Sequence, residues 1–303
     1  MAISLPRTLA PLAPLTAALA LLSAAPALAR ATRTTSSNWS GYALHRREVS
    51  FTAVSGTWRV SSAVCSPGEQ TYSSSWVGLG GYNPSAQALE QIGTETDCTA
   101  TGAVITSAWY ELVPEASVTI GRRALTVRPG DLVHGSVSAQ LTRGSWRVRV
   151  RLADYTTGRS FERTLKPSLL DLSSAEWIEE APSRCDALGD CQVLPLADFV
   201  RVAFSGARAV DRSGHAGSIS SPRWTRTAIY LVANGGRRYV GQRQGTLAAP
   251  SPLRSKGRAF TITYEGQPPS TPPATPTYES ARVAALPWGE PARHLQPGGA
   301  RAR

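Results

Sequence analysis

The sequence predicts an all-β protein, an antiparallel β-sandwich of two packed sheets. Short β-prone segments follow one another between clusters of Gly, Pro, Asn and Ser, at the spacing typical of sandwiches. No convincing amphipathic helix follows the first thirty residues, which disfavours βαβ folds. The chain has 303 residues, and removal of both ends leaves about 230 for one domain, a size that suits a large sandwich.

Both ends of the chain differ in composition from the middle. Residues 1–29 carry an early Arg7, an apolar run at 9–22 and a small-x-small pattern at 27–29, which predicts a signal peptide and a secreted protein. We expect a short leader at 30–36, the sandwich at 37–265 and a Pro-rich, Arg-containing disordered tail at 266–303. The tail could also block a cleft. No later stretch approaches the roughly 20 apolar residues of a membrane span.

The predicted strands run through the whole middle segment. A turn at Thr157-Gly158 joins two of them as a hairpin. The segments with strand composition are 39–44, 52–60, 73–79, 103–113, 117–120, 132–141, 146–154, 160–165, 175–179, 199–204, 228–233 and 259–264.

The net charge of +11 first suggests nucleic acid as a partner. The arginines are dispersed, however, and between Trp146 and Leu152 they alternate with apolar residues, the period of a half-buried strand. A solvated sheet face explains them better. We therefore expect no nucleic-acid partner and a monomeric protein.

Four cysteines remain after the signal peptide: Cys65, Cys98, Cys185 and Cys191. An even number in an exported protein favours two disulfides, with three pairings possible in principle. We prefer Cys65–Cys98 with Cys185–Cys191, because each closes a local loop. Neither CxxC nor an HExxH-type spacing occurs and the histidines lie far apart, so we expect no metal and no cofactor.

Four segments concentrate Trp, Glu, Gln and Gly within predicted strands, where acidic residues are normally depleted. They read SWVGLGG at 75–81, LEQIG at 89–93, AWYEL at 108–112 and AEWIEE at 175–180. In this order they resemble the motifs of the glutamic peptidases, the eqolisin family (G1), as a bacterial-type exported member. The likeness runs from SNWSGY at 37–42 through PLADF at 195–199 to about residue 264.

The resemblance implies a sandwich of the concanavalin-like or jelly-roll type and endopeptidase activity in acid on protein or peptide substrates. By the same resemblance, Gln91 and Glu176 match the catalytic pair, and Trp76, Trp109 and Glu111 match residues that line the cleft. The chain departs from the fungal pattern at Gly80, where those members carry an aspartate. It also has too few residues before Ser37 for their inhibitory propeptide.

The chemistry of the pair can be argued from the residue types. A carboxylate at Glu176 can deprotonate water and return the proton to the departing amine. The side-chain amide of Gln91 offers N–H donors to the oxyanion and a carbonyl that orients water. An unperturbed carboxyl would lose this base form below about pH 4.

The main alternative is a carbohydrate-binding or glycoside-hydrolysing lectin-like sandwich. Glycosidases need two carboxyls about 5–9.5 Å apart. In a strand, Glu176 and Glu179 point to opposite faces, and Glu180 lies about 13 Å along the strand from Glu176. Glu111 could supply a partner from another strand. A non-catalytic binding module is the third reading. Serine, cysteine and aspartic peptidases are disfavoured, because their nucleophile and Asp-Thr/Ser-Gly motifs are missing.

Overall fold

The computed structural model describes residues 31–185, 191–233 and 245–266. The predicted signal peptide and nearly all of the predicted tail therefore lie outside the described residues. The strands are β1 (Ala31–Ser36), β2 (Trp39–His45), β3 (Phe51–Arg59), β4 (Thr71–Gly80), β5 (Leu89–Cys98), β6 (Val104–Val113), β7 (Val118–Thr119), β8 (Leu132–Thr142), β9 (Ser145–Asp154), β10 (Arg159–Leu165), β11 (Ser174–Glu180), β12 (Ser183–Cys185), β13 (Cys191–Val193), β14 (Arg201–Asp211), β15 (Ala216–Gly217), β16 (Thr225–Val232), β17 (Thr246–Pro250) and β18 (Phe260–Tyr264). One 3₁₀ turn, η2 (Ser255–Gly257), precedes β18.

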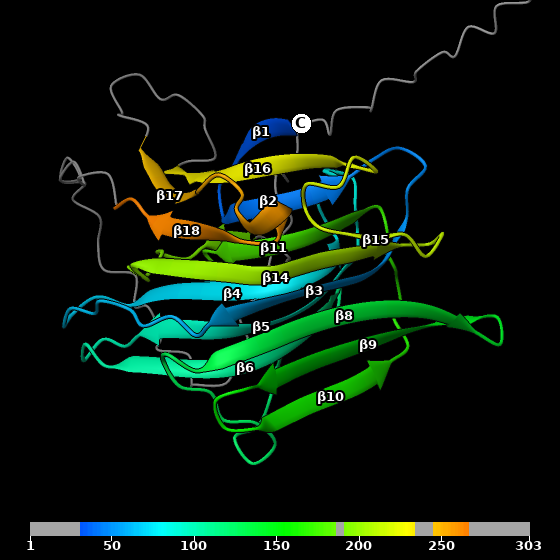
Figure 1. Ribbon diagram of the computed structural model, residues 1–303. Coiled ribbons are helices and arrows are strands. Elements are labelled where there is room, and N and C mark those ends of the chain that lie inside the picture. The colour runs from blue at the N-terminus through cyan, green and yellow to red at the C-terminus, as the bar shows by residue number, and fades with distance from the viewer. Residues whose placement is uncertain (1–30, 186–190, 234–244, 267–303) are drawn as a thin grey trace, which may run out of the picture.

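The strands form two layers joined along one edge (Figure 1). The first layer has the order β16-β2-β11-β4-β5-β6-β7, and β1 pairs in parallel with β16. The second layer has the order β10-β9-β8-β3-β14, and β18 and β17 connect β14 back to β16. The described residues thus form the predicted β-sandwich, and β12 and β13 make a separate small sheet.

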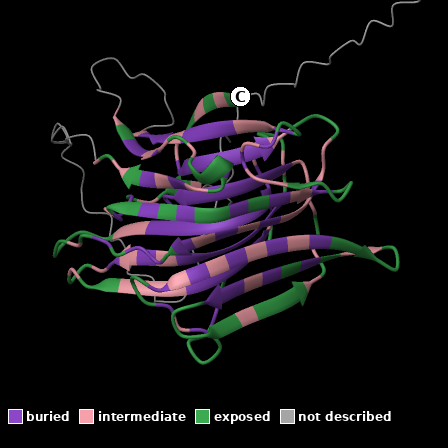
Figure 2. Ribbon diagram, viewed as in Figure 1, coloured by how far each residue is buried: buried purple, intermediate pink, exposed green. Residues whose placement is uncertain are grey.

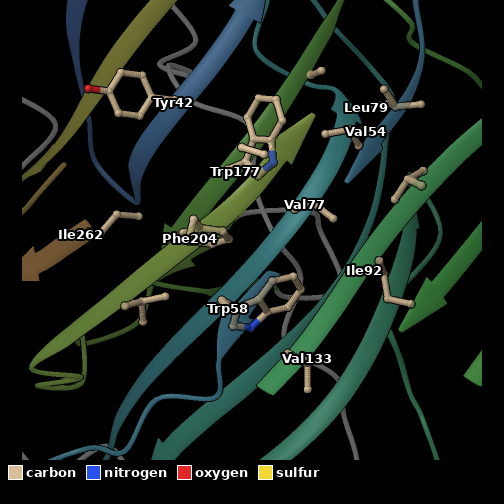
Figure 3. Packing of buried hydrophobic residues seen from close by; sticks show 14 of the residues in the cluster. Tyr42, Val54, Trp58, Val77, Leu79, Ile92, Val133, Trp177, Phe204 and Ile262 are labelled. Carbon is tan, nitrogen blue, oxygen red and sulfur yellow. The ribbon is translucent and has the colours of Figure 1, made fainter. Parts of the chain in front are cut away.

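The principal core lies between the two layers (Figure 3). Trp177 of β11 and Trp58 of β3 are fully buried there. Each indole fills space left by a glycine: a Cβ atom at Gly56 would lie 2.8 Å from Cδ1 of Trp177, and one at Gly135 would lie 2.6 Å from Cη2 of Trp58. The layers therefore pack closely, because large aromatic rings lie directly against the backbone of glycine residues.

The basic segment on β9 has the predicted half-buried character. Val148 and Val150 are buried in the core, whereas Arg147 and Arg149, which alternate with them, are exposed. Arg149 forms an ion pair with Glu162 of β10, the strand that is exposed along most of its length (Figure 2). These arginines solvate the outer face of the second layer.

Both preferred disulfides are present. Cys65 bonds to Cys98 at the end of β5, and Cys185 bonds to Cys191 across β12 and β13. The first bond ties a loop to a strand of the first layer, and the second closes the small sheet.

Most predicted strands are present within one to three residues of their expected bounds. The expected strand ranges omit β5, although it carries one of the four motifs, and β17, and β14 begins at Arg201 and extends to Asp211, well past residue 204. Residues 31–36, expected to be a leader, form the edge strand β1. Between Asp154 and Arg159 the chain turns at Thr157-Gly158 as predicted, with Gly158 at a φ of +72°.

Candidate active site

The four sequence motifs lie on adjacent strands of the first layer, and their polar residues fall into one row. Glu176 of β11 is directly opposite Gly78 of β4, Gly78 is opposite Gln91 of β5, and Gln91 is opposite Glu111 of β6. We call these four residues the catalytic row. Residues directly opposite each other in antiparallel strands project to the same face. The row therefore lies on the face of the first layer that points away from the second layer.

Gly78 lies between the two predicted catalytic residues. Two strand spacings separate Gln91 from Glu176, about 10 Å between backbones, and the residue between them in the row, Gly78, has no side chain. A Cβ atom at position 78 would lie only 2.9 Å from the ring of Trp76. The Trp76 ring and the Leu89 side chain occupy the space that a side chain at position 78 would need, so glycine is required there.

Gln91 is fully buried, and its amide has a defined orientation. Nε2 donates a hydrogen bond of 2.7 Å to Oε2 of Glu111. Because an ionised carboxylate only accepts hydrogen bonds, this contact directs the NH₂ group toward β6. Oε1 has no hydrogen-bond partner. Its carbonyl and the second N–H of Gln91 are therefore available to a water molecule or a substrate.

Glu176 is also fully buried, and neither of its carboxylate oxygens has a hydrogen-bond partner. Burial raises the pKa of Glu176 well above its usual range. The neighbouring Ser174 hydroxyl opposes this rise in pKa, and the negative charges of Asp171 and Glu90 add to it. The carboxyl group of Glu176, at the β11 end of the row, is thus a stronger base, once ionised, than a free glutamate.

A second row, which contains two indole rings, lies beside the catalytic row. Ile178, Trp76, Gly93 and Trp109 are opposite one another on the same four strands. A Cβ atom at Gly93 would lie 2.7 Å from Cβ of Trp76 and 3.0 Å from Cζ2 of Trp109. Glycine is therefore required for the two indoles to approach each other.

Hydrogen bonds fix both indoles. Trp76 Nε1 donates to Oε2 of Glu180 at 2.8 Å, and Trp109 Nε1 donates to Oγ of Ser74 at 3.0 Å. Asn38 donates through Nδ2 to the other oxygen of Glu180 at 3.0 Å. Glu180 thus holds the wall of the site, a role that sequence reasoning did not assign to it.

Further carboxyl groups are buried in the same strands. Burial raises the pKa of Glu90 well above its usual range, and the negative charge of Asp171 adds to the rise. Burial likewise raises the pKa of Asp97 to about 9 and that of Glu179 to about 8. Glu179 faces the interlayer core, where Oγ of Ser75 donates to its Oε2. These groups favour the neutral form in the folded protein.

The geometry of the row disfavours the glycosidase alternative for its two acids. Gly78 and Gln91 stand between Glu176 and Glu111, whose backbones are therefore three strand spacings apart, about 14 Å. The carboxyls of a glycosidase lie about 5–9.5 Å apart. Among the described residues, no group of three His, Cys, Asp or Glu side chains is arranged to hold a metal ion.

The structure brings together all five predicted site residues. Gln91, Glu176 and Glu111 belong to the catalytic row, and Trp76 and Trp109 belong to the neighbouring row of rings. The row offers a carboxylate base and an amide on either side of Gly78. It can therefore activate a water molecule and stabilise an oxyanion without a covalent intermediate.

Comparison with known proteins gives consistent matches. The sequence profile of the Peptidase A4 family matches residues 37–235. A scytalido-glutamic peptidase solved with a transition-state analog inhibitor is 26% identical, with a TM-score of 0.60, over 75% of this chain and 98% of that chain. The eqolisin SCP-B, solved in a complex with the tripeptide Ala-Ile-His, shares the fold at 23% identity and a TM-score of 0.57, with the same coverage. A search of curated protein sequences gives no match.

Proposed function

The chain belongs to the Peptidase A4 family, the glutamic peptidases, and is a glutamic endopeptidase; from this premise we propose that Glu176 and Gln91 are its catalytic residues. The observation that carries the proposal is their placement on one face, on either side of Gly78. Trp76, Trp109 and Glu111 are proposed to line the substrate cleft, with Glu111 orienting the amide of Gln91.

The proposed reaction proceeds by direct attack of water. Ionised Glu176 accepts a proton from a water molecule, whose oxygen bonds to the peptide carbonyl carbon and forms a tetrahedral intermediate. The free N–H of Gln91 stabilises the oxyanion. Protonated Glu176 then gives the same proton to the amine as the C–N bond breaks. The products are a carboxylic acid and an amine, and the enzyme regains its starting state.

We propose that the enzyme acts in acid, with a lower pH limit set by Glu176. Because burial raises the pKa of Glu176, this limit lies above the value of about 4 expected for a free carboxyl. The buried carboxyls of Glu90, Asp97 and Glu179 support acid activity in a second way, because a fold that holds them neutral is most stable where they are protonated.

We propose that the protein is secreted through the signal peptide at 1–29 and acts as a monomer on protein or peptide substrates, without nucleic acid. Both disulfides support an oxidising compartment. No helix among the described residues is long and apolar enough to span a bilayer.

The test compares two glutamates of the same strand that face opposite sides. Glu176→Gln removes the base, so kcat/KM for casein should fall by about 10²–10⁴-fold. Glu179→Gln is the matched control: the pKa of Glu179 is raised to about 8, so in acid its carboxyl is neutral and an amide resembles it. This variant should keep near-normal activity.

Circular dichroism of each variant verifies the fold, and release of reducing sugar from polysaccharides is assayed in parallel. A folded Glu176→Gln variant with near-normal proteolysis would refute the catalytic assignment. Sugar release that depends on Glu176 would favour the lectin-like alternative.

A further inference from the structure

The site contains a carboxylate that none of the sequence motifs supplies. Gly80 is directly opposite Leu89, which packs in the cluster of Trp76 and Trp109 on the site face. Position 80 therefore faces the same side as the catalytic row, one row further along β4 from Gly78. In the resembling pattern an aspartate stands at this position, and here the strand provides no side chain at all.

The side chain of Asp171 occupies the space that a residue at position 80 would fill. A Cβ atom on Gly80 would lie 2.7 Å from Cβ of Asp171, 3.0 Å from its Cγ and 2.6 Å from its carbonyl oxygen. Asp171 comes from the segment before β11. The positive φ of Gly80, +82°, and the close approach of Asp171 both require glycine at this position.

Backbone N–H groups hold the carboxylate in place. Gly81 N donates to Oδ2 of Asp171 at 3.1 Å, and Ser173 N donates to Oδ1 at 2.8 Å. The first bond crosses from the end of β4, and the second is local to the turn before β11. Asp171 is thus fixed to both strands that carry the catalytic row at this end of the site.

We propose that Asp171 is a positioning residue, which supplies from the turn before β11 the carboxylate that position 80 lacks and places negative charge beside Glu176. The proposal rests on the proposed role of Glu176 as base. The charge disfavours ionisation of Glu176, so Asp171 raises the pH at which the base form appears.

The other groups around Glu176 must be separated from this effect. On its own strand lies Ser174, and β2 brings His45 opposite Ser174. On β4 the facing residue is Gly78, which carries no group. On β5 are Gln91, which is paired with Glu111, and Glu90, whose charge when ionised acts in the same direction as that of Asp171, although burial favours its neutral form. A neutral residue at position 171 removes the charge of Asp171 and leaves these neighbouring side chains unchanged, so it separates the effect of Asp171 from theirs.

The experiment measures kcat/KM against pH for Asp171→Asn. Asparagine keeps an acceptor for the Ser173 N–H but loses the charge. The acid limb of this profile, where kcat/KM falls as the pH decreases, should move to lower pH by about one unit. At a pH one unit below the wild-type midpoint, the variant should then be roughly fivefold faster than wild type. Damage to the fold could not produce such a gain.

Asp154→Asn is the matched control, because Asp154 also accepts backbone N–H groups, from Thr156 and Thr157, at the β9–β10 turn of the second layer. Its acid limb should stay in place. Asp171→Glu keeps the charge and should retain the wild-type limb. If Asp171→Asn does not fold, Asp171→Ser takes its place, with a hydroxyl as acceptor. An unchanged limb in the folded neutral variant, or an equal shift in Asp154→Asn, would overturn the proposal.

A second readout does not depend on catalysis. The fall in unfolding free energy from pH 4 to pH 8 should be smaller in Asp171→Asn than in wild type, and this difference should decrease when both chains carry Glu176→Gln. The part that remains comes from Glu90, whose pKa Asp171 also raises. If activity survives Glu176→Gln but this coupling is observed, the proposed catalytic role fails and the electrostatic role of Asp171 stands. If the coupling is missing, the role of Asp171 fails by itself.

Discussion

The two faces of β4, β5, β6 and β11 are built from alternating residues of the same strands, yet they differ in almost every property. The interlayer face carries Val77, Ile92, Tyr110 and Trp177 in a continuous apolar core. The opposite face carries the catalytic row, with buried polar oxygens that have no partner at Gln91 and Glu176. Buried polar groups are normally hydrogen-bonded, and exceptions call for an explanation. Unpaired carboxylate oxygens of Glu90 and Glu179 are buried on the interlayer side as well, so the two faces are distinguished by the continuous apolar packing of one and the row of polar side chains on the other.

Disruption of the core face should have the largest effect on stability. Trp177→Ala removes a fully buried indole and its hydrogen bond of 2.8 Å to the carbonyl oxygen of Ser55. The free energy of unfolding in urea should fall by about 3–5 kcal/mol. On the site face, Trp76→Phe should lower this free energy by about 1–3 kcal/mol, because Oε2 of the buried Glu180 loses its indole N–H donor, and should lower kcat/KM. Equal losses of stability in the two variants would contradict the division between the faces.

The pH dependence of stability should be the next largest effect. The pKa values of Glu90, Asp97, Glu176 and Glu179 are all raised in the folded state. The folded protein therefore binds more protons than the unfolded chain above about pH 4, so the free energy of unfolding is greatest below that pH and decreases as pH rises toward 8–9.

Urea unfolding should give a stability lower by on the order of 2–3 kcal/mol at pH 8 than at pH 4. Replacement of Glu179 by Gln should reduce this difference, because it removes one of the titrating groups. A stability that rises between pH 4 and pH 8 would show that the folded state favours the charged forms.

A methyl group added at Gly78 should have the smallest effect on stability and a larger one on activity. In Gly78→Ala the new methyl group would meet the ring of Trp76, which its bond to Glu180 restrains. We expect a loss of about 1–2 kcal/mol from overpacking and a clear fall in kcat/KM. Gly121→Ala is the matched control, because a new Cβ there would have no atom within 4 Å and, as at Gly78, the backbone conformation does not itself require glycine. Unchanged activity in Gly78→Ala would show that glycine is not needed in the row.

The sequence allowed most of the first layer to be predicted, because its motifs are contiguous and each lies within one strand. Alternation along β11 correctly assigned Glu176 and Glu179 to opposite faces, since the period of a strand is two residues. The preference for cysteine pairs that close local loops predicted both disulfides correctly. The resemblance of the ordered motifs identified the family, and the structure brings together the residues that it implied.

The parts that could not be predicted depend on contacts between distant segments. Nothing in the pattern around Asp171 indicates that its side chain fills the space above Gly80, because that contact joins residues about ninety positions apart. Residues 31–36 have no strong strand pattern and become β1 by pairing with β16. The raised pKa values follow from burial, which periodicity alone does not quantify.

The course of β14 has a consequence for the durability of the enzyme. This strand pairs with β3 of the second layer and with β18, which leads through β17 back to the first layer. The backbone hydrogen bonds of β14 to β3 on one side and to β18 on the other thus join the two layers. We therefore expect the described sandwich to unfold in a single cooperative step. A peptidase that does not unfold partially exposes few of its own peptide bonds to other copies of the enzyme. This connectivity should therefore limit self-digestion.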